Sequence, residues 1–123
     1  MVIEELNFSR DSFQDILAKD DRYHPYAYVF LSEIVNRLME KSGGKHVSGE
    51  EVLEEFKEFA LDQFGPLSYT VLTEWGVKAC EDIGEMMFNL CDSGRIGRNE
   101  DDQPESFSGG YDFEETFLGP YRE

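Results

Sequence analysis

Residues 47–66 carry the strongest local folding signal in this chain, because both ends of one helix are marked there. Ser48 and Glu51 have the spacing of a capping box, and valines occupy the two flanking staple positions. A Gly-Pro pair at 65–66 then ends the apolar pattern. The sequence therefore predicts a helix from about Gly49 to Phe64, with a core face that carries Leu53, Phe56, Ala60 and Phe64 and is widened by Val52 and Phe59.

Two helices are predicted before this one. Ser9 can cap the first, which the polar run "AKDDRYH" ends. Pro25 suits the first position of the second, and a glycine pair at 43–44 ends it. The apolar spacing supports both helices, through Phe13, Ile16 and Leu17 in the first and Ala27, Phe30, Leu31, Ile34, Val35, Leu38 and Met39 in the second.

Two helices are predicted after it. A short fourth helix is expected over 67–75, where Trp75 would be a core aromatic at the junction of two helices. The fifth, from about Ala79 to Ser93, is expected to bury Ile83, Met87, Leu90 and Cys91, with Met86 and Phe88 broadening that face. We therefore expect a mainly α fold of about five helices in a single domain over 1–123, a common domain size.

The segment after Gly94 changes character. "RIGR" and "GGYDF" are short glycine-flanked pieces on either side of a polar loop, so a C-terminal β-hairpin is predicted over 95–113. The order helix, glycine turn, helix, hairpin in "WGVKACEDIGEMMFNLCDSGRIGRNEDD" makes the second half winged-helix-like. Residues 1–8 are expected as a tail, and residues 114–123 either fray or pack through Phe117, Leu118 and Tyr121.

The formal net charge of −16 argues against nucleic acid as a partner. The chain has 11 lysines and arginines against 27 aspartates and glutamates, whereas binding to DNA depends on cationic contacts to phosphate. An anionic membrane surface is disfavoured for the same reason. Without a signal-peptide pattern or a membrane-spanning apolar run, we expect a soluble cytoplasmic protein whose field would attract basic protein surfaces.

The acidic side chains gather in two places, which are the tentative partner-binding residues. On the predicted third helix they recur every four positions, so that like charges are neighbours on one face, at a local cost of about 0.2–0.5 kcal/mol per pair. The second place is the loop of the hairpin. The acidic face of the helix is either a docking surface or only a solubilising surface. The tentative partner-binding residues are Glu50, Glu54, Glu58 and Asp62 on the helix and Glu100, Asp101 and Asp102 in the loop.

Catalytic and metal sites have weak support. Cys80 and Cys91 would be eleven residues apart on one helix, roughly 16 Å, which is too far for a disulfide, and their spacing is not that of a zinc site. A Cys80–His46 pair stays open because sequence does not give its distance. The loop from 99 to 110 fails the EF-hand pattern. We predict no catalytic, cofactor-binding or metal residues and no cofactor.

Four collinear segments between residues 22 and 117 carry a family resemblance: "RYHPYAYVFL", "HVSGEEVLEEFKEFALDQFGPLSYTVLTEWGV", "EDIGEMMFNL" and "YDFEETF". Together they resemble a family of small bacterial proteins of unknown function, known only by a locus-tag name. The resemblance implies no activity and supplies no site residue. The function must therefore be inferred from the residues themselves.

The residues favour a non-catalytic protein-interaction or regulatory module that docks a protein partner. The first alternative is a diverged winged-helix DNA-binding regulator, and the second is a small enzyme or metal-dependent protein. The sequence leaves the partner and the oligomeric state open.

Overall fold

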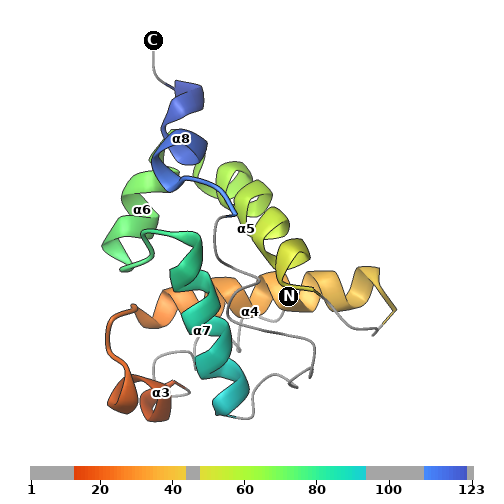
Figure 1. Cartoon of the computed structure of the whole chain (residues 1–123), viewed down its shortest axis with the longest axis vertical. Coiled ribbons are helices and arrows are strands. Elements are labelled where there is room, and N and C mark those ends of the chain that lie inside the picture. The colour runs from red at the N-terminus through yellow and green to blue at the C-terminus, as the bar shows by residue number, and fades with distance from the viewer. Residues whose placement is uncertain (1–12, 44–47, 94–109, 122–123) are drawn as a thin grey trace.

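The computed structural model describes residues 13–43, 48–93 and 110–121, and in these ranges the chain is mainly helical (Figure 1). The order is α3 (Gln14–Lys19), α4 (Pro25–Lys41), α5 (Gly49–Phe64), the 3-10 turn η1 (Gly65–Leu67), α6 (Ser68–Glu74), α7 (Cys80–Asp92), α8 (Phe113–Phe117) and the 3-10 turn η3 (Gly119–Tyr121). The mainly α prediction is confirmed, and α3 to α7 correspond to the five predicted helices.

The local signals act as the sequence predicts. The Ser48 hydroxyl accepts a hydrogen bond from the Glu51 amide, and the Glu51 carboxylate accepts one from the Ser48 amide, both at 3.1 Å. Pro25 is the first residue of α4, where the His24 ring accepts a hydrogen bond from the Tyr26 amide. The predicted cap of the first helix, Ser9, lies outside the described residues.

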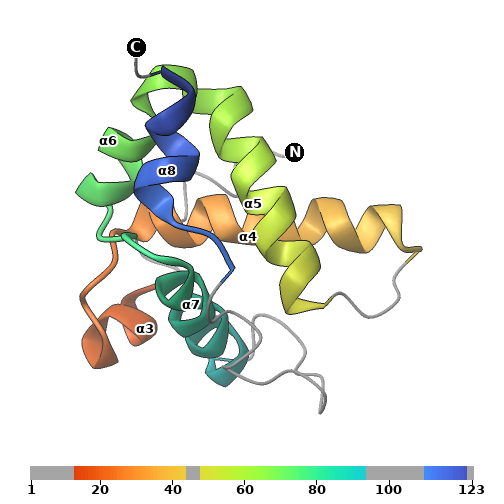
Figure 2. The ribbon, with the colours of Figure 1, turned by 45° about the horizontal axis from the view of Figure 1, so that its top comes forward.

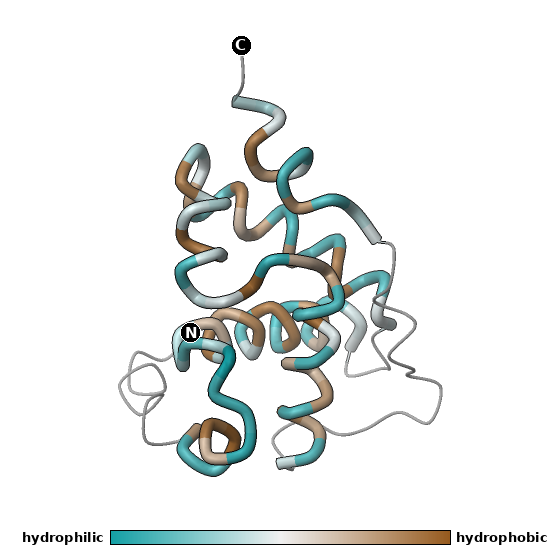
Figure 3. The backbone as a smooth tube through the Cα atoms, turned by 60° about the vertical axis from the view of Figure 1, so that its left-hand side comes forward, coloured by the Kyte–Doolittle hydropathy of each residue, from teal (hydrophilic) through white to brown (hydrophobic). Residues whose placement is uncertain are grey.

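Helix α4 crosses the molecule, and α5 and α7 both pack against it (Figures 1 and 2). The chain alternates hydrophilic and hydrophobic residues along its helices, as amphipathic helices around a shared core do (Figure 3). Side chains from α3 to α8 join one hydrophobic cluster, whose largest fully buried members include Tyr23, Tyr28, Leu31, Ile34, Phe56, Leu72, Ile83, Met86, Leu90 and Phe117.

The turn between α6 and α7 depends on Gly76. Its φ is +89°, in the left-handed region, and a Cβ there would collide with the backbone carbonyl of Arg22. The neighbouring Trp75 carbonyl accepts a hydrogen bond from the His24 amide at 3.0 Å. This backbone contact joins the start of α4 to the end of α6, and it explains why glycine stands at this position.

The rotation of α7 differs from the predicted one. Ile83 and Leu90 are buried as expected, but Met86 is fully buried whereas Met87 is only half-buried. Cys91 is also half-buried, and Phe88 is 45% exposed. Trp75 is half-buried rather than enclosed, with its ring 5.7 Å from Phe30 and 5.6 Å from Phe64.

The predicted strand "GGYDF" is wrong over the described residues 110–113. Phe113 begins α8, because Asp112 caps this helix by accepting a hydrogen bond from the Glu115 amide at 2.8 Å. Phe113 and Phe117, four positions apart, are both buried, as a helical face requires. The part of the chain that the structure describes contains no β-strand, and the other predicted strand, "RIGR", lies outside it.

The C-terminal segment packs on the body through α8, and the exposed 3-10 turn η3 follows it and contacts α8. Figure 2 shows α8 lying across α5 and α6, and Phe117 is fully buried, while Tyr121 is 45% exposed. Residues 1–8, 122 and 123 lie outside the described residues, so the tail prediction there stays a prediction. None of the described helices combines the length and the apolar character needed to cross a membrane.

Candidate protein-docking surface

The outer face of α5 carries the predicted acidic residues. Glu50, Glu54, Glu58 and Asp62 are all exposed, and because α5 is helical throughout, they follow one another at every fourth position. The last lies twelve positions after the first, which is about 18 Å along the helix axis. We call these four residues the acidic ridge.

Few groups neutralise the acidic ridge. The Glu54 carboxylate lies 3.0 Å from the ammonium group of Lys57, and the Asp62 carboxylate accepts a hydrogen bond from the side-chain amide of Gln63 at 3.2 Å. Glu50 and Glu58 form no ion pair with any described residue. With respect to the described residues, the ridge therefore presents negative charge to solvent that Lys57 compensates only in part.

Two other α5 carboxylates have structural roles. Glu51 completes the capping box. Glu55 faces α4 and pairs with Lys41 at 3.0 Å and Arg37 at 3.3 Å, and its side chain is only 12% exposed. Burial by itself would raise the pKa of Glu55, but the hydrogen bonds and charges of Lys41 and Arg37 outweigh it and lower the pKa below its ordinary value.

The exposed face of α7 is also acidic. Glu81, Glu85 and Asp92 are exposed on it, and Lys78 just before the helix is exposed as well. Arg22 lies 3.8 Å from Glu85, and Lys19 lies 3.5 Å from Asp92. In a winged helix this element would enter the DNA groove, yet it would bring carboxylates toward the phosphates.

Most lysine and arginine side chains among the described residues form ion pairs. Each of these cations lies within reach of a carboxylate on a neighbouring turn or helix, and the set comprises Lys19, Arg22, Arg37, Lys41 and Lys57. A cationic strip that could follow a nucleic-acid backbone is not formed by them.

A polar network that the sequence did not predict joins the α3–α4 turn to α7. Asp20 accepts two side-chain hydrogen bonds from Arg22, at 2.8 and 2.6 Å, and a third from Asn89 at 3.0 Å. Asn89 also donates to the hydroxyl of the buried Tyr28 at 3.0 Å. The hydrogen bonds from Arg22 hold the pKa of Asp20 well below its ordinary value, against the opposing effect of burial.

A second polar contact fixes the start of α7. Asp82 accepts hydrogen bonds from the backbone amides of Lys78 at 2.9 Å and Ala79 at 3.1 Å. The hydroxyl of the buried Tyr23 donates to the same carboxylate at 2.6 Å. Burial raises the pKa of Tyr23, and the hydrogen bond to Asp82 adds to this effect. Asp82 is therefore a structural carboxylate and does not belong to a docking surface.

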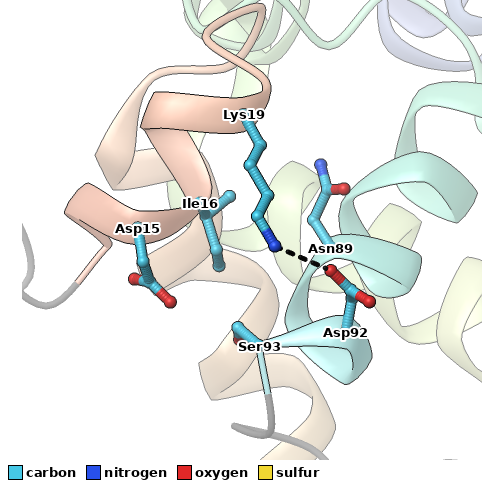
Figure 4. A pocket seen from close by; sticks show the side chains of 6 residues that line it. All are labelled: Asp15, Ile16, Lys19, Asn89, Asp92 and Ser93. Carbon is cyan, nitrogen blue, oxygen red and sulfur yellow. Dashed lines mark hydrogen bonds and ion pairs between the residues drawn. The ribbon is translucent and has the colours of Figure 1, made fainter.

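A small hollow lies between α3 and the end of α7 (Figure 4). Its volume is about 20 Å³, which suffices for about one water molecule. Lys19 reaches across it toward Asp92, and the other lining residues are Asp15, Ile16, Asn89 and Ser93. The hollow is too small for an organic substrate.

The candidate nucleophile Cys80 lies in the core. It is 1% exposed, and its thiol donates a hydrogen bond to the Tyr111 carbonyl at 3.4 Å. Burial raises the pKa of this thiol, which opposes thiolate formation. The possible base, His46, lies outside the described residues, as do the loop residues Glu100, Asp101 and Asp102. Cys80 and Cys91 both lie in α7, so the helix itself keeps them apart.

Among residues 13–43, 48–93 and 110–121, no group of three or more histidine, cysteine, aspartate or glutamate side chains is arranged to hold a metal ion. Comparisons with protein-family models, with curated proteins and with solved structures find no match to this chain. The resemblance to the small bacterial family therefore stays a prediction, and the function has to be inferred from the surface itself.

Proposed function

We propose that this chain is a non-catalytic protein-interaction or regulatory module that docks a protein with a basic surface on the acidic ridge of α5. The observation that supports this proposal is the contrast within α5. Glu55 is paired with cations of α4, whereas Glu50 and Glu58 on the outer face have no ion-pair partner among the described residues. A basic partner would relieve the like-charge repulsion along the ridge.

The field of such a ridge accelerates encounter more than it strengthens the final complex. Exposed ion pairs are screened by salt, with a Debye length of about 10 Å at 0.1 M. We therefore expect a partner that associates quickly at low ionic strength and dissociates as salt is added. The loop residues Glu100, Asp101 and Asp102 are a second part of the proposed surface, which stays a prediction.

The test is affinity capture from the native cell with three forms of the chain, washed at about 0.05 M and about 0.5 M salt. One form is wild type, and one carries Glu54→Lys and Glu58→Lys in the ridge. The third is a matched control with the same change of net charge, Glu40→Lys and Glu74→Lys, at exposed positions outside α5. The proposal expects a salt-sensitive protein partner that wild type and the control retain and the ridge variant loses.

Two results would contradict the proposal. Equal loss of the partner in the ridge variant and the control would mean that only net charge matters. Recovery of nucleic acid with all three forms would favour the alternative, a diverged winged-helix DNA-binding regulator. A small enzyme or metal-dependent protein ranks last, because burial of Cys80 opposes a thiolate nucleophile.

A further inference from the structure

Residues 110–121, which we call the C-terminal strap, cover one side of the helical body. The strap contains α8 and η3, and it packs against α5 and α6 (Figure 2). Helix α8 has only five residues, far fewer than a helix needs to be stable by itself in water. Its conformation therefore depends on its contacts with the body.

Three aromatic side chains of the strap contribute to those contacts. Phe113 and Phe117 are buried, and the Phe113 ring lies 6.4 Å from Phe56 of α5. The Tyr111 hydroxyl donates a hydrogen bond to the backbone carbonyl of Leu53 at 2.8 Å. The helices α4, α5 and α7 pack against one another as well.

Cys80 lies directly beneath the start of the strap. Its thiol donates to the Tyr111 carbonyl at 3.4 Å, and a Cβ added at Gly110 would stand 3.1 Å from the sulfur and 2.7 Å from a methyl group of Leu53. Cys80 as a residue is 1% exposed while the strap is in place. Because residues 110 and 111 lie against the sulfur, opening of the strap would uncover it.

We propose that the strap opens as a unit from a body that stays folded, and that this opening controls access to the Cys80 thiol and to the apolar surface of α5 and α6 beneath it. The reason is the difference in helix length. Helix α8 has five residues and keeps its conformation only through contacts with the body, whereas α4, α5 and α7 have 17, 16 and 13 residues. A short segment held by a few anchors can open at a lower free energy than the core. This inference does not depend on the acidic ridge or its partner.

The test measures alkylation of Cys80 by iodoacetamide in the full chain carrying Cys91→Ser, so that a single thiol reports. The alkylation rate of the folded chain is divided by the alkylation rate of the urea-unfolded chain. This ratio is then compared with the unfolded fraction obtained from equilibrium unfolding. Opening of the strap predicts a native-state rate at least about tenfold above the value that global unfolding allows. It also predicts that low urea concentrations hardly change this rate.

Two variants separate the strap from the body. Phe117→Ala should raise the alkylation rate at least about a hundredfold, because it removes a buried anchor of the strap. The control, Leu38→Ala, destabilises α4 far along the chain from the strap and should leave the local rate nearly unchanged. Far-UV circular dichroism verifies that the body of each variant is folded.

A third variant covers the case in which Phe117→Ala does not fold. Gly110→Ala introduces the close contacts with Leu53 and Cys80 at the start of the strap, and it should raise the rate while the body remains folded. The proposal is overturned if the wild-type rate equals the value set by global unfolding. It is also overturned if the strap variants change the rate only in proportion to global stability, as Leu38→Ala would then do.

Discussion

Asp20 and Asp82 differ from Glu50 and Glu58 in what surrounds their carboxylates. The two aspartates accept hydrogen bonds from Arg22, Asn89, Tyr23 and backbone amides at the junction of α4 and α7. The two glutamates stand on the outer face of α5 without an ion pair to any described residue. The same functional group thus stabilises the fold in one region and is costly in the other.

The carboxylates of this acidic chain therefore fall into two classes, those with hydrogen-bond partners inside the fold and those exposed on its surface. Net charge alone does not identify a docking surface, because some of the carboxylates that contribute to it are bound by other groups of the folded chain. Only the carboxylates that remain exposed and unpaired are available to a partner. The comparison can be tested by removing carboxylates from each region.

The largest expected effect is at Asp82. Asp82→Ala removes the hydrogen bonds that cap α7 and leaves the buried hydroxyl of Tyr23 without its acceptor. We expect a loss of about 2–4 kcal/mol in the free energy of unfolding, measured by urea denaturation. Glu81→Ala, the exposed neighbour in the same helical turn, is the control and should cost less than about 1 kcal/mol. Equal losses of unfolding free energy in the two variants would mean that the hydrogen-bonded carboxylate of Asp82 stabilises the fold no more than an exposed one.

The next effect is at Asp20, and it depends on pH. The pKa of Asp20 in the folded chain lies below its value in the unfolded chain, which is near 3.9. Its stabilising contribution is therefore fully present above about pH 4 and is lost as the pH falls toward the folded pKa. Asp20→Asn should be less stable than wild type by about 1–2 kcal/mol at pH 7.

The measurement for Asp20 is urea unfolding of both forms from pH 7 down to pH 2.5. The gap between wild type and Asp20→Asn should close below about pH 4. A gap that stays constant over this range would show that the charge of Asp20 contributes nothing and that only its shape matters.

The smallest effect compares two residues of the same helix. Glu55→Gln removes a charge that pairs with Lys41 and Arg37, so we expect a loss of up to about 1 kcal/mol. Glu58→Gln removes a like-charge neighbour from the ridge, and we expect a gain of about 0.2–0.5 kcal/mol. Thermal and urea unfolding at low salt would resolve the opposite signs, and both effects should shrink in high salt. A loss at both positions would mean that the ridge is stabilising.

The predictions from sequence were most accurate where the signal is local. Helix α5 begins and ends where the capping box and the Gly-Pro pair place its ends, and Pro25 opens α4. The hairpin prediction failed because it relied on glycines and overlooked a local signal. Asp112 and Glu115 have the spacing of a helix start, and Phe113 and Phe117 have helical spacing, which together would have predicted α8.

The buried face of α7 shows a limit of pattern reading. Met86 and Met87 are adjacent, and an apolar stripe with Ile83 and Leu90 can be completed by either one. In the folded chain Met86 is fully buried in the shared core, and Met87 is only partly buried against it. The choice depends on the neighbouring helix, so the sequence of α7 alone could not make it.

Capping, apolar spacing and charge depend on residues close together in the chain, so the helices α3 to α7 and the excess of acid could be predicted without a structure. The tertiary structure decided which acids have partners, since Asn89 and Asp20 are 69 positions apart and Tyr23 and Asp82 are 59 apart. It also placed the strap over Cys80. Such contacts form only when the whole core is assembled, because the entropy of bringing distant segments together is compensated by burial elsewhere.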